Sequence, residues 1–575
     1  MTRVLVLDSK SVLADLESVL AALQSQDSDL VVIAGDLVIN QAVLAPIVEN
    51  PFAGTCAAVR RSAQGNIRVL HHQLIAAGTT FHSVNAPNAN SVGVVRIAAR
   101  DRDAALLTVR DLKQCIAQGL VVLQSSEVVE GIITALLRSQ IPVKEVEIID
   151  APWFRSPTDW EQAQQKVASM SEVSIRKLQA NRMDDGFYST FIVRKLSKPL
   201  TSLAIQLHMS PNLITVISFV VGLATAAAFA TGNRWVIVLG AVLLQLSLII
   251  DCVDGEVARA TRRFSVLGAW LDASTDRVKE YAAYAGLAAG AVVMGVDSWQ
   301  AWTLAIVLMI VQTARHMGDY NFAAIQRLRE VGLPAAALTD PTDPWGNHRS
   351  ALTKFTQSNR RAPIHWIKKV IHMPIGERWL VLSVIAAIFN GYWALLTLLV
   401  LTGLAWVYTL LGRIVRTLRW SHEPVGERII ADQIDSGPIF GALGTIIRIP
   451  PVWTTSRWNW ATPMLLRIAE MTLIAAIAMY VYPQWETLAF GYLFIVAFHH
   501  YDNLYRALGG SRAPRWITWS ALGFEGRSVI IAVAGFLGIT AFHDALNLGV
   551  AWLFMWCVVI ASAQFLGAAR KDAVL

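Results

Sequence analysis

The stretch Asp251-Cys252-Val253-Asp254-Gly255-Glu256-Val257-Ala258-Arg259 ends one apolar segment, and Gly268, Asp272 and Asp276 follow near the start of the next. Carboxylates three or four residues apart share a helix face, so Asp251 pairs with Asp254 and Asp272 pairs with Asp276. Two such helices side by side would aim four carboxylates at one point. Because buried charge is costly in a bilayer, the stretch predicts a compensating partner.

Two kinds of partner would compensate these carboxylates. Protonation or salt bridges to Arg259, Arg262 or Arg263 would make the cluster structural. A divalent metal would make it functional, because hard oxygen ligands suit Mg²⁺ or Mn²⁺ and a paired site holds two ions. We favour the metal, since Gly255 leaves room for a ligand and Arg259 offers a fixed cation to a phosphate.

The composition places this stretch in a membrane protein. Of the 575 residues, 54% are hydrophobic and 16% are charged, which excludes a disordered chain and a simple soluble enzyme. Segments of about twenty apolar residues predict spanning helices. We expect ten of them, near residues 212–231, 235–254, 270–295, 299–318, 378–390, 393–412, 463–482, 487–503, 528–542 and 548–568.

The basic residues give these segments an orientation. The connections expected on the outer side contain one Lys or Arg, Arg234, whereas the opposite connections are rich in cations. The positive-inside rule then predicts a multi-pass protein of the plasma membrane with both termini in the cytoplasm. This placement explains the net charge of +7 without a nucleic-acid partner. The four scattered cysteines are expected to be reduced.

Residues 1–175 are predicted to form a soluble α/β domain of Rossmann-like type. Short apolar runs alternate with helical patterns, which favours a mainly parallel sheet covered by helices. The expected strands are 4–7, 31–34, 55–59, 91–97 and 143–149, and the expected helices are 12–23, 101–117 and 128–139. Residues 176–211 then form a basic amphipathic linker, with Arg194, Lys195 and Lys198, that we expect to lie on the membrane surface.

The aspartate stretch has the form D-x-x-D-G-x-x-A-R-x8-G-x-x-x-D-x-x-x-D, and in this it resembles the CDP-alcohol phosphotransferase family at all specified positions. The resemblance implies a six-helix membrane domain, here 212–429, that transfers the phosphoryl group of a CDP-linked alcohol to an acceptor alcohol and releases CMP. The site residues that it implies are the metal ligands Asp251, Asp254, Asp272 and Asp276, the general base Asp276, and the cytidine and pyrophosphate contacts Gly255, Ala258, Arg259 and Gly268.

The resemblance extends beyond the motif. Asn212 and Thr215 open the first segment much as in family members, and either helix capping or nucleotide contact explains them. Arg277 and Lys279 follow the last aspartate and are candidates for an acceptor phosphate, although ordinary interfacial cations would look the same. The family also implies a homodimer.

The order of domains is similar to that of bifunctional inositol-1-phosphate cytidylyltransferases/di-myo-inositol-phosphate-phosphate synthases, which favours an inositol-phosphate-type or other phosphorylated polyol acceptor. Ala34-Gly35-Asp36 resembles the strand-end metal aspartate of nucleotidyltransferases, and the segment 148–153 resembles the end of their domain. However, the glycine-rich phosphate loop is replaced by Asp8-Ser9-Lys10-Ser11, and the second metal aspartate after Trp153 is missing. We therefore expect a degenerate, non-catalytic domain.

Residues 430–575 are predicted to form further membrane helices of unknown function. They contain polar groups in or beside apolar runs, namely Arg467, Glu470, His499, His500, Tyr501, Asp502, Arg506, Glu525 and Arg527. Ionisable residues inside a membrane invite a functional interpretation. The competing interpretation, which we favour, is that they pair with one another and with the first bundle.

Three alternatives remain open at the level of sequence. A divalent-cation transporter would use the same four aspartates, but it leaves Gly255, Ala258 and Arg259 unexplained. An active cytidylyltransferase is the alternative to a degenerate domain for residues 1–175. The same residues would otherwise serve as a nucleotide-sensing or partner-binding module that regulates the membrane enzyme.

Overall fold

The structure is a computed structural model that describes residues 2–574, apart from 9, 26–27, 51–52, 63–64, 71, 180–185, 332–369, 421–424, 444–454 and 509–512. Part of the predicted basic linker and the cation-rich loop before residue 370 therefore lie outside the described residues. The chain divides into two compact units, one built mainly from residues 1–182 and the other from most of 183–575.

The first unit contains a seven-stranded sheet in the order β1–β2–β7–β4–β8–β6–β5. Its strands are β1 (Arg3–Val6), β2 (Leu30–Ile33), β4 (Cys56–Arg61), β5 (Ile67–Leu70), β6 (Gln73–Ala77), β7 (Ala89–Ile97) and β8 (Lys144–Glu147). A separate two-stranded sheet joins β3 (Leu37–Ile39) to β9 (Trp153–Arg155). All five predicted strands are present, although their ends differ by a few residues.

The prediction of a mainly parallel sheet is wrong, because the sheet is mixed. β1 and β2 are parallel, as are β4 and β8, but the central strand β7 runs antiparallel to both β2 and β4. Parallel neighbours need a long crossover connection, usually a helix. β5 and β6, which follow β4 in the chain, form a hairpin instead, so the chain returns into the sheet in the antiparallel sense.

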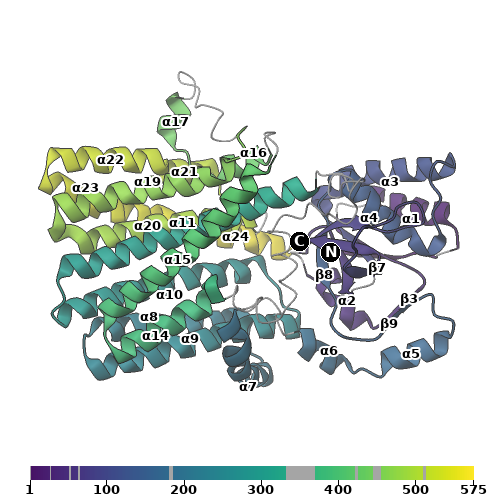
Figure 1. Ribbon diagram of the computed structural model, residues 1–575, viewed down its shortest axis with the longest axis horizontal. Coiled ribbons are helices and arrows are strands. Elements are labelled where there is room, and N and C mark those ends of the chain that lie inside the picture. The colour runs from purple at the N-terminus through teal and green to yellow at the C-terminus, as the bar shows by residue number, and fades with distance from the viewer. Residues whose placement is uncertain are drawn as a thin grey trace. The chain divides into compact units, whose positions relative to one another are not determined.

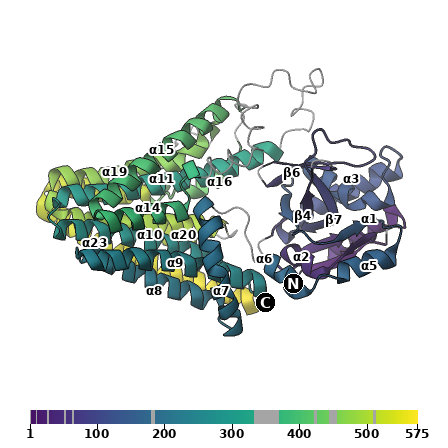
Figure 2. The same cartoon turned by 60° about the horizontal axis from the view of Figure 1, so that its bottom comes forward.

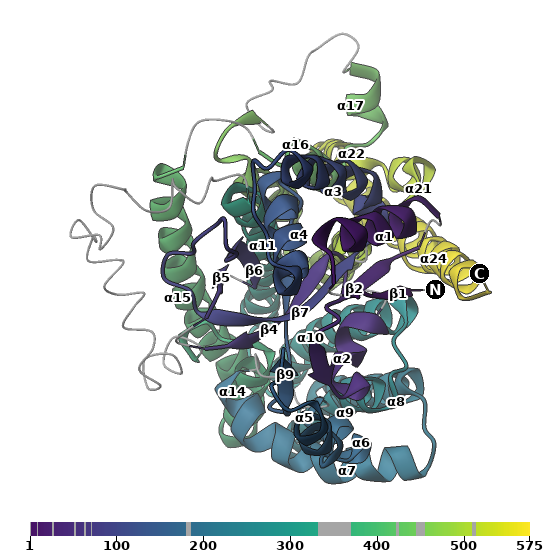
Figure 3. The ribbon, with the colours of Figure 1, turned by 90° about the vertical axis from the view of Figure 1, so that its right-hand side faces the viewer.

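Helices cover both faces of this sheet, as Figure 3 shows. Side chains of successive strand residues point to opposite faces. Val32 packs in a core with α1 (Val12–Ser25), α3 (Arg102–Ala117) and α4 (Val128–Arg138), whereas Val31 packs in a core with α2 (Gln41–Val48). The helices α5 (Trp160–Ala168) and α6 (Glu172–Gln179) follow β9.

The second unit is a helical bundle whose long helices run side by side (Figures 1 and 2). Its first part comprises α7 (Arg194–Gln206), α8 (Pro211–Ala230), α9 (Arg234–Thr261), α10 (Val266–Val293), α11 (Ser298–Val331), α14 (Ile375–Ile388) and α15 (Gly391–Leu418). Its second part comprises α16 (Glu427–Gln433), α17 (Pro438–Leu443), α19 (Thr462–Ala476), α20 (Glu486–Leu508), α21 (Arg515–Ser520), α22 (Gly523–Leu537), α23 (Ile539–Leu553) and α24 (Ala561–Val574). One hydrophobic core continues through both parts.

Among the described residues, six helical stretches are long and apolar enough to cross a membrane. They are α8, α9, α15 and the stretches Asn459–Val481, Arg515–Leu537 and Ile539–Gly567. The other predicted spans also coincide with helices, namely α10, α11, α14 and α20. α14 is short, with 14 residues, and α10 carries Asp272, Asp276, Arg277, Lys279 and Glu280.

The last two predicted spans, 528–542 and 548–568, are misplaced. The chain breaks between α22 and α23 at Gly538, whose φ is +121°, and not at the predicted connection 543–547. Glycine adopts such a φ without the steric cost that other residues meet. His543 and Asn547 lie one turn apart within α23 and contact each other, so their polarity did not mark a loop.

Glycines set the close packing of α8 against α10. A Cβ at Gly286 would lie 2.3 Å from the Ala226 carbonyl oxygen, and a Cβ at Gly290 would lie 2.0 Å from that of Phe229. Small residues let membrane helices approach at backbone distance. This contact fixes α8 beside the helix that carries two of the motif aspartates.

Candidate functional site

α9 and α10 bring the motif aspartates together. Carboxylate oxygens of Asp251, Asp254 and Asp272 all lie within 4.8 Å of one another. Asp276, one turn after Asp272, joins the same group through Lys279. The helical spacing predicted these pairs, and the packing of the two helices places both pairs in one cluster.

Lys279 lies inside this cluster. Its Nζ is 2.6 Å from Asp251 Oδ1 and 3.0 Å from Asp276 Oδ1, and it donates to Ser218 Oγ at 3.0 Å. The side chain is fully buried and crosses the helix α8 at Gly222, where a Cβ would lie 2.6 Å from Lys279 Cγ. The lysine that we considered for an acceptor phosphate is therefore a partner of the aspartates.

α8 supplies hydroxyl groups to the cluster. Thr215 donates to Asp254 Oδ2 at 2.5 Å, and Ser218 donates to Asp251 Oδ1 at 3.2 Å. Asn212 lies beside the motif glycine, because a Cβ at Gly268 would be 2.9 Å from Asn212 Oδ1. Both residues that open the first predicted span thus lie next to motif residues.

The donor set fits a divalent cation. Four carboxylates and one lysine carry a net formal charge of −4 + 1 = −3, and Lys279 is the cation for which contacts with the cluster are described. Carboxylate oxygens at this spacing are the ligands that Mg²⁺ and Mn²⁺ prefer. Of the remaining motif residues, Gly255, Ala258 and Arg259 continue along α9 beyond Asp254.

Arg277 has different neighbours from Lys279. It is bonded to Glu280 at 2.5 Å, and Glu280 also accepts from Arg378 Nε at 2.8 Å and from the Tyr284 hydroxyl at 2.9 Å. The Arg277 guanidinium also lies over the Tyr501 ring, 5.9 Å from its centroid. This buried ion group ties α10 to α14 and α20.

Helices of the C-terminal part hold the start of α10. Trp270 Nε1, two residues before Asp272, donates to Asp502 Oδ1 at 2.8 Å. Arg506 Nε donates to the other oxygen of Asp502 at 2.9 Å, and the Trp270 and Phe565 rings are 5.0 Å apart. Further along α10, the hydroxyl groups of Tyr281 and Tyr501 are 3.0 Å apart.

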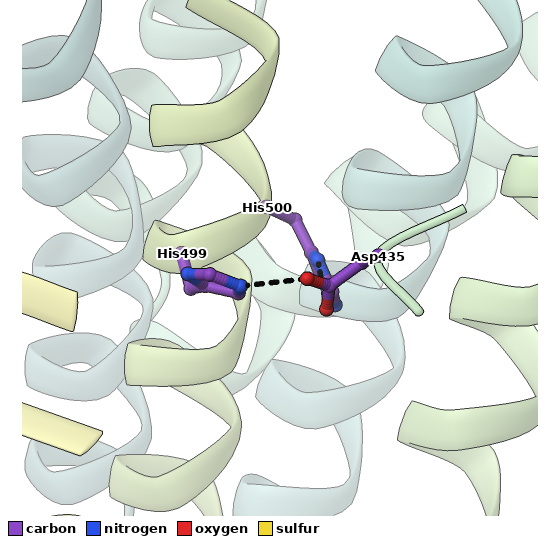
Figure 4. Close-up of side chains that lie close together, drawn as sticks. All are labelled: Asp435, His499 and His500. Atoms are coloured by element: carbon purple, nitrogen blue, oxygen red, sulfur yellow. Dashed lines mark hydrogen bonds and ion pairs between the residues drawn. The ribbon is translucent and has the colours of Figure 1, made fainter. Parts of the chain in front are cut away.

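A second group of ionisable residues lies within the C-terminal part, and we call it the Asp435 cluster. It consists of Asp435, Arg467, Glu470, His499, His500 and Arg527, all of which are buried. His499 Nε2 lies 3.0 Å from Asp435 Oδ1 (Figure 4), and Arg527 Nη2 lies 2.7 Å from Asp435 Oδ2. Arg527 also binds Glu470 at 2.7 Å, and His500 Nε2 lies 2.9 Å from Glu470.

Asp435 stays ionised in these surroundings. Burial alone would raise its pKa, but the charges of His499 and Arg527 and the hydrogen bond with His499 hold the pKa well below its usual value. The prediction that the C-terminal polar residues pair with one another and with the first bundle agrees with these contacts. Asp435 is absent from the predicted ionisable residues of the C-terminal part, because it stands in a polar connection with no motif around it.

In the first unit, Arg155 lies against Asp36. Its Nε donates to both carboxylate oxygens of Asp36 at 3.0 Å, and its Nη1 donates to Glu130 at 2.9 Å. Ser156 donates to Asp36 at 2.6 Å. Burial alone would lower the pKa of Arg155, but Glu130 and Asp36 raise it above its usual value, so the guanidinium is charged.

The helical bundle and its carboxylate cluster define a membrane protein with a group of carboxylates that could hold a divalent cation, and comparison with known proteins narrows this class. Residues 208–339 match the family model described as CDP-alcohol phosphatidyltransferase. The chain therefore carries a domain of that family. Residues 444–575 match a family of unknown function, DUF5941.

Several named proteins are similar to this chain over part of their length. A bifunctional IPC transferase and DIPP synthase of Aquifex aeolicus is 32% identical over 203 residues, which are 33% of this chain and 43% of the relative. An archaetidylinositol phosphate synthase of Pyrococcus horikoshii is 32% identical over 115 residues, 20% and 55% of the two chains. A phosphatidylinositol phosphate synthase of Mycolicibacterium smegmatis is 34% identical over 107 residues, 18% and 46% of the two chains. The matches thus span about half of each relative.

Proposed function

We propose that this protein is a membrane transferase that moves a phosphoryl-linked group from a CDP-alcohol to an acceptor alcohol and releases CMP. The observation that carries the proposal is the cluster of four carboxylates on α9 and α10, within the part of the chain that matches the CDP-alcohol phosphatidyltransferase family. Two relatives are named archaetidylinositol phosphate synthase and phosphatidylinositol phosphate synthase, which favours a phosphorylated cyclitol such as inositol phosphate as the acceptor.

In this proposal Asp251, Asp254, Asp272 and Asp276 hold Mg²⁺ or Mn²⁺, as two ions. Metal held by these carboxylates would supply positive charge to neutralise the pyrophosphate and the departing CMP. Asp276 takes the proton of the acceptor hydroxyl as that oxygen attacks the phosphorus. The cytidine and pyrophosphate contacts are Gly255, Ala258, Arg259, Gly268, Asn212 and Thr215. Arg277 and Lys279 are proposed on the acceptor side, where an acceptor phosphate would have to compete with Glu280 for Arg277 and with Asp251 and Asp276 for Lys279.

Replacement of one aspartate tests this assignment. The Asp276→Asn variant is expected to lose CMP release in membranes supplied with labelled CDP-linked donors and a panel of phosphorylated polyols. Asp544→Asn, whose side chain is 70% exposed, is the matched control and should retain activity. Full activity of Asp276→Asn would refute the assigned base. Ion flux without any CDP substrate would favour the transporter instead.

We also propose that residues 1–175 form a degenerate, non-catalytic domain. Arg155 and Ser156 already bind Asp36, so a guanidinium takes the position in which a metal would contact this carboxylate. In addition, β1 stands at the edge of the sheet, whereas nucleotide sites of such folds lie between neighbouring strands. When the full chain is incubated with labelled CTP and inositol phosphate, we expect no CDP-linked product. Formation of that product would refute the proposal.

The remaining expectations concern boundaries and location. We propose domains at 1–175, 176–211, 212–429 and 430–575, in a multi-pass protein of the plasma membrane with cytoplasmic termini. Supporting the linker assignment, α7 exposes Leu196 and Leu203 while Ser197 and Thr201 donate to the buried Glu256 of α9.

Labelling of single cysteines placed at each terminus, in intact cells and in inverted vesicles, tests the orientation. Crosslinking in membranes tests the homodimer.

A further inference from the structure

A cavity of about 580 Å³ opens in the C-terminal part, beside the Asp435 cluster. It lies between the connection from α16 to α17, the end of α20, and α21. Its lining includes Gln433, Asp435, Phe440, Asn503 and Trp519. Cavities of about 300–1,000 Å³ are typical of small-molecule sites in proteins.

The floor of the cavity carries no excess negative charge. Asp435 is held by Arg527 and His499, and Glu470 is held by Arg527 and His500. The oxygen and nitrogen atoms of Asp435, His499 and His500 lie close enough to hold a metal ion. However, Arg527 supplies the positive charge there, so a divalent cation would add uncompensated charge. The floor therefore favours an uncharged contact over a metal.

Two amide side chains, Gln433 and Asn503, also line the cavity. Gln433 is 6% exposed, and its side-chain amide has no hydrogen-bond partner among the described residues. The Asn503 amide nitrogen lies 3.2 Å from His499 Nε2, which leaves its carbonyl oxygen available. An amide offers both donors and an acceptor, and hydroxyl groups are their natural complement.

Aromatic rings line the same cavity. Trp519 is 48% exposed and packs on Gly441, where a Cβ would lie 3.0 Å from its ring. Phe440 also lines the cavity, as does Arg515, whose side chain is exposed. A cavity with both a flat apolar ring and amides suits the C–H face and the hydroxyl groups of a hydroxylated ring, and the exposed cation suits an attached phosphate.

We propose that this cavity binds a polyhydroxylated ring of monosaccharide size, a sugar or cyclitol, that carries a phosphate. Gln433 and Asn503 bind its hydroxyl groups, Trp519 stacks on its C–H face, and Arg515 binds the phosphate. This ligand chemistry has two sources, a free phosphorylated polyol and a lipid headgroup. The site is separate from the aspartate cluster and does not need the transfer reaction.

Binding to the full-length protein in nanodiscs tests the proposal. The Asp276→Asn chain serves as the background, so that turnover does not interfere. One arm measures the binding of myo-inositol 1-phosphate to the protein by calorimetry. The other arm measures the binding of the protein to vesicles with and without phosphatidylinositol. We expect saturable binding in one arm that Trp519→Ala and Gln433→Leu each weaken about tenfold, which corresponds to about 1.4 kcal/mol.

Trp516→Ala is the matched control, because Trp516 lies on the same helix, is 50% exposed and does not line the cavity. It should change the affinity less than twofold. Equal losses in Trp516→Ala and Trp519→Ala would overturn the proposal, as would binding that neither cavity variant alters. Since the assay uses no CDP substrate, its failure is distinguishable from a failure of the proposed transfer, which would appear as absent CMP release.

Discussion

The aspartate cluster on α9 and α10 and the Asp435 cluster are both groups of carboxylates in the helical bundle, but the first is partly exposed, the second is buried, and they differ in their balance of charge. In the first, four carboxylates face Lys279. In the second, Asp435 and Glu470 face Arg467 and Arg527, so the carboxylates and guanidiniums cancel. A divalent ion would reduce the excess charge of the first cluster and would create excess charge in the second. Neighbouring ligand atoms alone therefore do not identify a metal site.

The largest expected effect concerns removal of metal from the first cluster. Chelation of divalent ions should abolish CMP release, and excess Mg²⁺ or Mn²⁺ should restore it. Because a ligand present at 100 times its Kd stabilises the folded state by about 2.7 kcal/mol, Mg²⁺ should also raise Tm. The Tm increase should disappear in Asp272→Asn. A metal-dependent Tm that survives in this variant would assign the ion to another site.

Breaking the second cluster should affect stability more than chemistry. Arg527→Met leaves Asp435 and Glu470 without their shared guanidinium and should lower the free energy of unfolding by about 3–5 kcal/mol. Thermal unfolding in detergent measures this loss, with the exposed Lys198→Met as control. Chelator should not alter the Tm difference between Arg527→Met and the wild type. A chelator-dependent difference would show that this cluster holds a metal.

The contact between Trp270 and Asp502 connects the C-terminal helices to the first cluster. Trp270→Phe removes the indole donor and should cost about 1–2 kcal/mol of stability. Because Asp272 lies two residues further on, kcat should fall severalfold with little change in KM for the donor. Trp393→Phe, on the exposed side of α15, should change neither value. An unchanged kcat in Trp270→Phe would mean that the C-terminal helices do not position α10.

The smallest expected effect lies at Ser218, which connects Lys279 and Asp251. Ser218→Ala removes one hydrogen bond from each and should cost about 0.5–1.5 kcal/mol. The salt bridge between Lys279 and Asp251 remains, so CMP release should fall less than tenfold. The exposed Ser202→Ala provides the comparison. A loss as large as that in Asp276→Asn would place Ser218 in direct contact with substrate.

Much of the fold followed from local pattern. Apolar segments located the helices α8 to α11, α14, α15, α19 and α20, and spacing paired Asp251 with Asp254 and Asp272 with Asp276. The predictions were wrong where a single residue or a single connection, and not the apolar pattern, sets the end of a helix or the direction of a strand. Gly538 ends α22 although the apolar run continues, and the β5–β6 hairpin reverses β7 although the sequence alternates like a parallel sheet.

By itself, the sequence determined the membrane class, the α/β domain before it and the identity of the four aspartates, because hydropathy and helical spacing act over short distances. Tertiary structure alone decided which cations meet which carboxylates. Lys279 joins the aspartates whereas its near neighbour Arg277 joins Glu280, since residues two apart on a helix point in different directions. Arg155 and Asp36, and Arg527 and Asp435, are paired across long separations in the chain. Charge balance depends on those pairings, and it separates a cluster with excess negative charge from one without it.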